Sequence, residues 1–416
     1  MSRVLLVCPE PLGHGQPAGI GIRFVEMAKV LRADGHTVAV LSRDGGFVAD
    51  CRTGVTTPEN LLQFSSESDV AVVQGHVAND LFAHAKPIPV VVDLYDPFIV
   101  ENLHYYATRG AEVFNHDHAT LVNSLTRGDL FLCASNAQRL FYLGLLLAVG
   151  RFNPILFQDD PRVESLIRIA PFGVQELAGE TDGTHGKEDA VLFGGIYDWY
   201  DPILAIDAVA LARERVPAMT LTFTRHPNPE LTPQGILAET IKYARKYDFV
   251  RFEPWATYEQ RGQFFSRFKA ALLTFPQSLE TDLSMRTRIY DYLWGGLPVV
   301  TSSAPGTDEL LARYGAGIVV TDPARSAAPE TGNRTSEIAS FADALVHVLT
   351  DDARYASMRR GARGFVEEHQ WTRTLEPLRE FCREPRVDPY KQEFSISMQV
   401  PQRPPSLLAR IKRRVF

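Results

Sequence analysis

Short apolar runs with the length of strands alternate with helical patterns along most of this chain, and the alternation occurs twice. The first series begins with a strand at Val4–Cys8, a helix at about Ile22–Ala33 and a second strand at Thr37–Leu41. This order favours a parallel sheet with right-handed crossovers. Such strands are buried on both faces, which explains why they are apolar throughout rather than alternating.

Further apolar runs extend the first series and then build the second. We predict strands at Asp69–Gln74, Val90–Asp93, Asp129–Ala134, Ile167–Ala170, Ala190–Phe193, Leu221–Thr224, Phe249–Phe252, Ala270–Phe275, Val299–Ser302 and Ile318–Thr321. Glu176–Asp189 separates the two series and, without any apolar period, is typical of a linker. The predicted fold class is therefore α/β, with two tandem Rossmann-like, doubly wound units followed by C-terminal helices.

Composition excludes several classes of protein. The 416 residues predict two or three domains, and the formal net charge of -7 argues against a general nucleic-acid binder. The four cysteines form no CxxC pair, which favours a reducing compartment and offers no zinc site. The chain leads directly into Val4–Val7, so we expect no signal peptide. The longest apolar tract, Phe141–Val149, is too short to span a membrane, and we expect a cytoplasmic protein.

The stretch Leu279–Pro298 carries the strongest local signal. Ser284 is predicted to cap a helix that ends at the glycine pair 295–296. Arg286 and Arg288 then fall near the helix N-terminus, where the helix dipole already disfavours cations. A phosphate or diphosphate bound among the two arginines would explain their position. Asp291, a little further along, can accept hydrogen bonds from hydroxyl groups such as those of a ribose.

A structural alternative exists for each of these signals. The arginine pair can instead bridge to local acids such as Asp282 and Asp291. The loop after the first strand contains Gly13 and Gly15, which let a backbone approach a ligand closely, but it is equally typical of a flexible turn. It does not match the dinucleotide fingerprint, because its spacing differs and no acid ends the second strand.

Taken in order, these segments resemble the GT-B glycosyltransferases, and within them the family-4-type retaining enzymes of bacterial surface-polysaccharide or glycoconjugate assembly. The strongest match is residues 284–300, SMRTRIYDYLWGGLPVV. Supporting matches are Asp93–Pro97, Cys133–Arg139, Pro171–Val174, Gly194–Trp199 and Arg225–Asn228. The likeness covers roughly residues 3–382, and its motifs are more specific for the fold than for the substrate.

The resemblance implies two domains that face each other across a cleft. Residues 1–175 would form the acceptor-side domain and 186–370 the donor domain, with 371–383 as a helix that returns to the first domain and 384–416 as a proline-rich basic tail. A nucleotide diphosphate-sugar is then the co-substrate, and a saccharide or lipid-linked molecule is the acceptor. We expect metal independence, because the chain has no DxD-type motif arranged for a divalent ion. No cofactor besides this co-substrate and no nucleic-acid partner are expected.

The resemblance also implies roles on the donor side. Asp291 stands where many relatives have a glutamate that binds the nucleotide ribose. The usual earlier glutamate is Leu283 here, a departure for which Glu280 or Asp282 can compensate. Glu280 would then lie near the sugar hydroxyls; the alternative for Glu280 is a carboxylate in solvent. Relatives also carry basic residues after the turn at Gly194 and Gly195, whereas Ile196–Asp201 holds none. Arg286 and Arg288 are the predicted substitutes, with Arg225 as a third.

The remaining predicted site residues come from turns that follow strands. Asp96 is predicted to hold an acceptor hydroxyl, or else to cap the next helix. Trp255 is predicted to cover the nucleobase, or to be a half-buried aromatic residue. His226 is predicted to reach the sugar or phosphate, or to be a turn histidine before Pro227. Ser284 and the turn glycines complete the predicted donor contacts.

The sequence also allows two other functions, and it predicts a membrane contact for which there are alternatives. A GT-B nucleotide-sugar epimerase and a non-catalytic GT-B partner protein both fit the pattern. The C-terminal tail from Phe394 has five basic residues and no acid, which predicts a peripheral contact with the inner face of a membrane. A disordered tail or a helix docked on the protein itself are the alternatives.

Overall fold

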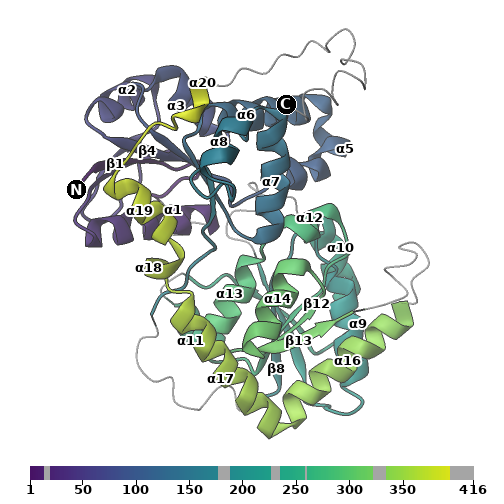
Figure 1. The fold of residues 1–416 in the computed structure, drawn as a ribbon. Helices are drawn as coiled ribbons and strands as arrows, with labels where there is room; N and C mark the ends of the chain where they lie inside the picture. The colour runs from purple at the N-terminus through teal and green to yellow at the C-terminus, as the bar shows by residue number, and fades with distance from the viewer. Residues whose placement is uncertain (14–18, 177–187, 226–234, 258–259, 322–333, 394–416) are drawn as a thin grey trace, which may run out of the picture.

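The computed structural model describes residues 1–13, 19–176, 188–225, 235–257, 260–321 and 334–393. They form two α/β units, each built on one parallel sheet that is flanked by helices (Figure 1). The fold class predicted from the alternating sequence pattern is confirmed.

The first unit contains a seven-stranded sheet with the order β3-β2-β1-β4-β5-β6-β7. Its strands are β1 Arg3–Val7, β2 Thr37–Ser42, β3 Arg52–Val55, β4 Val70–Val73, β5 Val90–Asp93, β6 Leu130–Cys133 and β7 Ile167–Ile169. Its helices are α1 Gly19–Ala33, α2 Pro58–Ser66, α3 Val77–His84, α4 Phe98–Glu101, η1 Asn102–Tyr105, α5 Tyr106–Arg109, α6 Ala111–Arg127, α7 Asn136–Ala148 and α8 Pro154–Asp159. The strand order reverses at β1, which pairs in parallel with both β2 and β4.

The second unit contains a six-stranded sheet with the order β10-β9-β8-β11-β12-β13. Its strands are β8 Ala190–Gly195, β9 Thr220–Arg225, β10 Val250–Pro254, β11 Ala270–Leu273, β12 Val299–Ser302 and β13 Gly317–Val320. Its helices are α9 Pro202–Ala212, α10 Gly235–Ala244, α11 Arg261–Phe265, α12 Leu279–Leu283, α13 Thr287–Trp294, α14 Pro305–Tyr314, α16 Arg334–Thr350 and α17 Asp352–Glu368. This order also reverses at its first strand, β8.

Burial explains which strands the sequence pattern detects. Every residue of β4, β5, β6, β11 and β12 is buried, so these strands are mostly apolar. The exceptions stand at carboxyl ends: Asp93 in β5, and Thr301 and Ser302 in β12. The edge strand β3 has no buried residue and carries Arg52, Thr53 and Gly54. It therefore lacks an apolar run, and the sequence analysis did not predict it.

The helix predicted from Ser284 onward is wrong in its boundary. The structure has two helices, α12 and α13, and Ser284 is the residue that ends the first. Ser278 caps α12, because its hydroxyl accepts a hydrogen bond from the backbone N–H of Thr281 at 3.1 Å. Arg286 occupies the cap position of α13 with an extended backbone and makes no side-chain cap hydrogen bond.

The last helices lead the chain back to the first unit (Figure 1). They are α18 Trp371–Thr374, α19 Glu376–Arg383 and α20 Tyr390–Glu393. Arg379 on α19 pairs with Asp34 beside α1 at 2.6 Å, and the buried Asp388 pairs with Arg151 at 2.5 Å. The start of the proline-rich tail is thus packed against the first unit. Residues 394–416, on which the membrane prediction rests, lie outside the described residues.

No described helix combines the length and the apolar character that a membrane crossing requires.

Candidate functional site

A cavity of about 320 Å³ lies where the carboxyl ends of the two sheets approach each other. In open α/β sheets, ligands bind at this edge and near the point where the strand order reverses. The first unit contributes Glu10, Gly19, Ile20, Ile22, Tyr95, Asp96, Pro97, Glu101 and Phe172. The second unit contributes Gly194, Gly195, Tyr197, Trp199, Tyr200, Thr224, Trp255, Arg261, Ser284, Met285, Arg286, Thr287, Arg288, Asp291 and Tyr292, among others.

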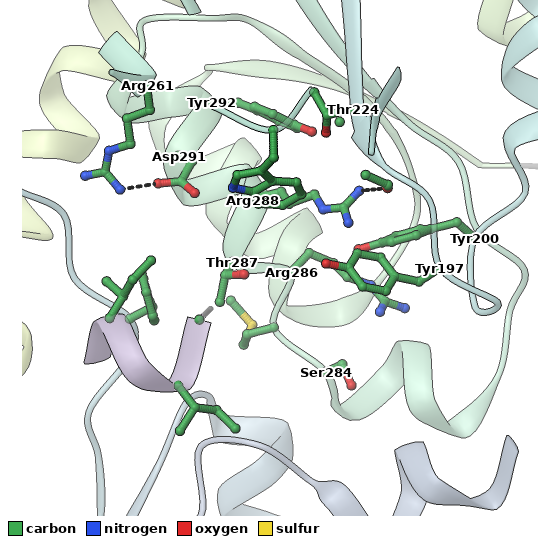
Figure 2. A pocket seen from close by; sticks show the side chains of 18 of the residues that line it. Tyr197, Tyr200, Thr224, Arg261, Ser284, Arg286, Thr287, Arg288, Asp291 and Tyr292 are labelled. Atoms are coloured by element: carbon green, nitrogen blue, oxygen red, sulfur yellow. Dashed lines mark hydrogen bonds and ion pairs between the residues drawn. The ribbon is translucent and has the colours of Figure 1, made fainter. Parts of the chain in front are cut away.

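Arg288 extends from the first turn of α13 into this cavity (Figure 2). Its guanidinium lies over the rings of Tyr197 and Tyr200, at 4.7 Å and 4.6 Å from their centroids. One terminal nitrogen, Nη1, donates to the backbone oxygen of Gly195. The other, Nη2, is buried and has no hydrogen-bond partner among the described residues. No described carboxylate forms an ion pair with Arg288, so its charge is available to an anion in the cavity.

The glycine turn at the end of β8 makes room for this arginine. Gly194 has φ +82°, and a Cβ there would lie 2.5 Å from the hydroxyl of Tyr292. A Cβ on Gly195 would lie 2.9 Å from the ring of Trp255 and 3.3 Å from Nη2 of Arg288. The two glycines are therefore required for Arg288, Tyr292 and Trp255 to approach the end of the strand.

Arg286 differs from Arg288, because a carboxylate neutralises it. Its two terminal nitrogens donate to the two oxygens of Glu280, each at 2.6 Å, and both side chains are only 3% exposed. The guanidinium also lies 4.9 Å from the centroid of Phe275. Arg286 lines the cavity and Glu280 does not. Glu280 thus neither faces solvent nor reaches the cavity; its carboxylate holds Arg286.

Asp291 lines the cavity one turn along α13 from Arg288 and points toward α11 (Figure 2). Its carboxylate pairs with Arg261 at 2.9 Å. Neither Arg286 nor Arg288 pairs with Asp291, so the alternative of an arginine pair bridging to this acid is wrong. Burial raises the pKa of Asp291, and the charges of Arg261 and Arg288 oppose that rise. The side chain of Asp291 is 29% exposed, so its carboxylate, held by one arginine, is a fixed hydrogen-bond acceptor that a ligand can reach.

The N-terminus of α13 adds partial positive charge to the same place. The helix starts at Thr287, which lines the cavity, and no side chain caps its first turn. The first backbone N–H groups of an α-helix have no partner within the helix, and they attract anions. Arg288 and this helix end together form a cationic region of the cavity wall.

Aromatic side chains also line the cavity, next to Arg288 and the glycine turn. Tyr197 and Trp199 stack on each other with centroids 5.1 Å apart and an angle of 5° between their planes. Trp255, which follows β10, lines the cavity and is 36% exposed. A flat, half-exposed ring of this kind offers a stacking surface for a planar group.

Two carboxyl groups of the first unit meet in the cavity wall. Asp96 follows β5 and Glu101 ends α4, and both side chains line the cavity. Asp96 does not cap α4, whose cap position is Pro97, so the capping alternative is wrong. The pKa of Asp96 is raised to about 6 by burial, with further raising by Glu10 and Glu280. Burial and the neighbouring Asp96 raise the pKa of Glu101 well above its usual range.

A second cavity of about 520 Å³ adjoins the first within the N-terminal unit. Asp96 and Ile20 line both cavities, so Asp96 stands at their junction. Polar side chains from α3 and its surroundings line the rest, including Gln74, His76, Asn79, Asn102 and His116. The amide of Gln74 is buried, and neither its oxygen nor its nitrogen has a partner among the described residues.

The structure does not bring every predicted residue to the cavity. Gly13 binds the side chain of Asp44 through its backbone N–H at 2.8 Å and is not among the residues that line the cavity. Arg225 is exposed at the end of β9 and does not line it either. Gly15 and His226 lie outside the described residues.

Several residues that shape the site were not predicted from the sequence: Tyr197, Tyr200, Arg261 and Glu101. The signal for the two tyrosines was present, because the segment after the glycine turn lacks basic residues and is rich in aromatic ones. The two tyrosine rings pack against the guanidinium of Arg288, which comes from α13. Within the described part of the chain, no group of three or more His, Cys, Asp and Glu side chains is arranged to hold a metal ion.

Solved structures with the same architecture are numerous, although no protein-family model and no curated protein sequence matches the chain. HepE from Anabaena, determined in complex with UDP-glucose, is 16% identical with a TM-score of 0.66 over 92% of this chain and 100% of HepE. WaaG, a glycosyltransferase involved in lipopolysaccharide biosynthesis, is 14% identical with a TM-score of 0.59 over 92% and 100% of the two chains. Sucrose-phosphate synthase from Thermosynechococcus elongatus is 13% identical with a TM-score of 0.59 over 92% and 98%.

These similarities define the class of fold. The chain has the GT-B fold, in which two Rossmann-like units face each other across a cleft. At 13–16% identity the similarity shows the fold alone.

Proposed function

We propose that this protein is a glycosyltransferase that moves a sugar from a nucleotide diphosphate-sugar to an acceptor hydroxyl. The observation that carries the proposal is Arg288, a buried guanidinium without a carboxylate partner, next to the uncapped N-terminus of α13 in the cleft of a GT-B fold. A departing diphosphate needs such fixed positive charge. The complex of HepE with UDP-glucose supports the same type of donor.

Residues of the second unit bind the nucleotide diphosphate-sugar donor in this proposal. Arg288 and the first turn of α13 bind the diphosphate. Arg286, whose charge Glu280 balances, lines the same wall and donates no net charge to it. Asp291, held by Arg261, accepts hydrogen bonds from the ribose hydroxyls. Trp255 stacks on the base. Arg225 and His226 stay proposed contacts to the sugar or phosphate.

Residues of the first unit bind the acceptor in this proposal. Asp96 lies at the junction of the two cavities, so an acceptor in the second cavity presents its hydroxyl there. The carboxylate of Asp96 accepts a hydrogen bond from that hydroxyl. The lining of amide, imidazole and carboxyl groups in the second cavity suits a saccharide, which offers hydroxyl groups that both donate and accept.

The proposed reaction needs no separate general base. The acceptor oxygen forms a bond to the anomeric carbon, the bond from that carbon to the diphosphate oxygen breaks, and the diphosphate leaves with the electron pair. The leaving oxygen then takes the acceptor proton, which gives retention of configuration when both events occur on one face of the sugar. Retention, metal independence, a role in polysaccharide or glycoconjugate assembly and a contact of the basic tail with the inner membrane face are parts of this proposal.

Acceptor-dependent release of a nucleoside diphosphate tests the proposal. The purified protein is incubated with a panel of nucleotide diphosphate-sugars, with and without a mixture of saccharide acceptors. We expect release that depends on the acceptor for at least one donor. Isomerised sugar without any acceptor would indicate an epimerase instead, and no binding of any donor would indicate a non-catalytic protein.

We expect Trp255→Ala to weaken binding of the nucleoside diphosphate about tenfold, because stacking of an aromatic residue on a base contributes roughly 1–3 kcal/mol. Trp255→Phe should retain most of the affinity, since it keeps a ring over the base. Calorimetric titration measures both. Unchanged affinity of Trp255→Ala would place the base elsewhere in the cavity.

A further inference from the structure

A third cavity, of about 620 Å³, adjoins the second one in the first unit. Arg43, His76, Asn102 and His116 line both of them. Asp96 lines the first and second cavities but not the third. The three cavities therefore follow one another, from the donor cleft past Asp96 and then past His76. Each is large enough for a small-molecule ligand, so the acceptor side offers room for more than one sugar.

His76, which precedes α3, stands where the second and third cavities meet. Its Nε2 lies 2.6 Å from Oδ1 of Asp117 on α6, a side chain that is only 2% exposed. A carboxylate accepts hydrogen bonds, so Nε2 carries the hydrogen and Nδ1 is an acceptor. The ring of His116 stacks on that of His76 with centroids 4.8 Å apart, and the ring of Phe98 packs at 5.3 Å. The imidazole is thus fixed in place, while 43% of the His76 side chain stays exposed to a ligand.

Two amide side chains extend the same polar wall. Asn102 donates from Nδ2 to Oδ2 of Asp117 at 3.0 Å, which leaves its amide oxygen to accept from a ligand. Gln74 is 2% exposed, and neither of its amide groups has a partner among the described residues. A buried amide of this kind destabilises a protein until a ligand or water satisfies it. Sugar hydroxyls both donate and accept, so they can bind both groups of the amide.

The charged residues of the two cavities favour a neutral ligand. Arg43 and Asp80 line the second cavity, and Arg109 and Glu112 line the third. Each cavity thus carries charges of both signs. An anion would be attracted by the arginines and repelled by the acids, whereas the hydroxyl groups of a neutral sugar can bind residues of both kinds.

We propose that the acceptor is the neutral end of an oligosaccharide, at least two sugars long. Its terminal sugar, which carries the reacting hydroxyl, lies in the second cavity between Asp96 and His76 and binds the amide of Gln74. The next sugar lies in the third cavity. His76 accepts a hydrogen bond from the saccharide through Nδ1, and Asp117 positions His76. The role of Asp96 rests on the proposed function, whereas saccharide binding by the two cavities is independent of it.

Ligand-observed NMR tests these saccharide subsites without any transfer reaction. The probes are methyl glycosides of neutral monosaccharides and of the disaccharides that end in them. We expect at least one disaccharide to bind about tenfold more tightly than its terminal monosaccharide, because the second sugar occupies a cavity of its own. His76→Phe keeps the stacked ring but lacks Nδ1, so it should weaken disaccharide binding about three- to tenfold. His347→Phe, the same change on the exposed side of α16, is the control and should bind as the wild type does.

Two further variants separate ligand binding from packing. Gln74→Leu removes the unpartnered amide, so its melting temperature should equal or exceed that of the wild type while disaccharide binding weakens. Asp117 acts through the side chains that it holds, so Asp117→Leu should weaken binding, and adding His76→Phe to it should cause no further loss. The inference would be overturned if no probe binds, if disaccharides bind no better than monosaccharides, or if His76→Phe keeps the affinity of the wild type.

Transfer assays keep a failure of this inference distinct from a failure of the proposed function. His76→Phe should raise KM for the acceptor about three- to tenfold and leave KM for the nucleotide-sugar within about twofold. If the glycosides bind as expected and no donor reacts, the proposed function fails and the saccharide subsites stand. If transfer occurs and His76→Phe changes neither disaccharide binding nor the acceptor KM, the subsites fail and the proposed function stands.

Discussion

Replacing Arg288 by methionine is expected to lower kcat for sugar transfer about 10²–10³-fold, the usual effect of removing one fixed donor that stabilises a leaving anion. Methionine fills the space over Tyr197 and Tyr200 but carries no charge. The kcat of Arg288→Lys should fall between those of the wild type and Arg288→Met. Lysine keeps the positive charge, but it lacks the planar guanidinium, which donates to Gly195 through Nη1 and leaves Nη2 for the ligand. The measurement is the rate of nucleoside diphosphate release at saturating acceptor.

The control for this prediction is Arg360→Met, which removes an arginine from the exposed side of α17. Its rate should equal that of the wild type. The melting temperature of Arg288→Met must be followed in parallel, because Arg288 is itself buried. A folded Arg288→Met variant with a rate within threefold of wild type would show that the diphosphate does not bind at this arginine.

Replacing Glu280 by alanine is expected to lower the free energy of unfolding by about 3–5 kcal/mol, because it leaves the buried guanidinium of Arg286 without its partner. Both side chains are 3% exposed, so water cannot compensate for the lost contact. The double change Glu280→Leu with Arg286→Met should recover much of the loss, since no buried charge remains. Chemical denaturation of the wild type and both variants measures these differences.

An exposed ion pair gives the matched comparison for Glu280. Arg215 and Asp343 pair at 2.7 Å with side chains 46% and 59% exposed, so Asp343→Ala should cost about 1 kcal/mol or less. From the resemblance, Glu280 is expected near the donor sugar, and the same variants test that role. If Glu280→Ala keeps its stability and loses only transfer activity, the carboxylate serves the ligand and not Arg286.

The sequence predicted the fold because its strands are buried. β4 and β12 are apolar or small at every position, since helices cover both faces of each sheet. Edge strand β3 was missed for the opposite reason, because its residues are half-exposed and polar. The boundary between α12 and α13 was also missed. Ser278 and Ser284 are both good cap residues by type. In the structure Ser278 caps α12, whereas Ser284 ends that helix and donates to Glu101 in the other unit.

The part of the candidate site that the sequence predicted is the arginine at the helix N-terminus, because a guanidinium in that position indicates an anion. The sequence alone indicated an anion at Arg288, because this arginine falls beside a helix N-terminus, and the structure places it in the cleft. The partners of charged groups were not predictable, because spacing along the chain does not determine them. Arg286 pairs with Glu280, a near neighbour, whereas Asp291 pairs with Arg261, thirty positions earlier. Glu101 was missed because its contact with Ser284 joins two units that are far apart in the sequence.

Calorimetric titration of nucleoside diphosphates into the protein tests the central claim most directly. At least one nucleoside diphosphate should bind, the monophosphate of the same base should bind more weakly, and Arg288→Met should lose the preference for the diphosphate while Arg360→Met keeps it. The claim that this cleft binds a nucleotide diphosphate-sugar would be contradicted if no nucleoside diphosphate binds, or if Arg288→Met binds the diphosphate as tightly as the wild type.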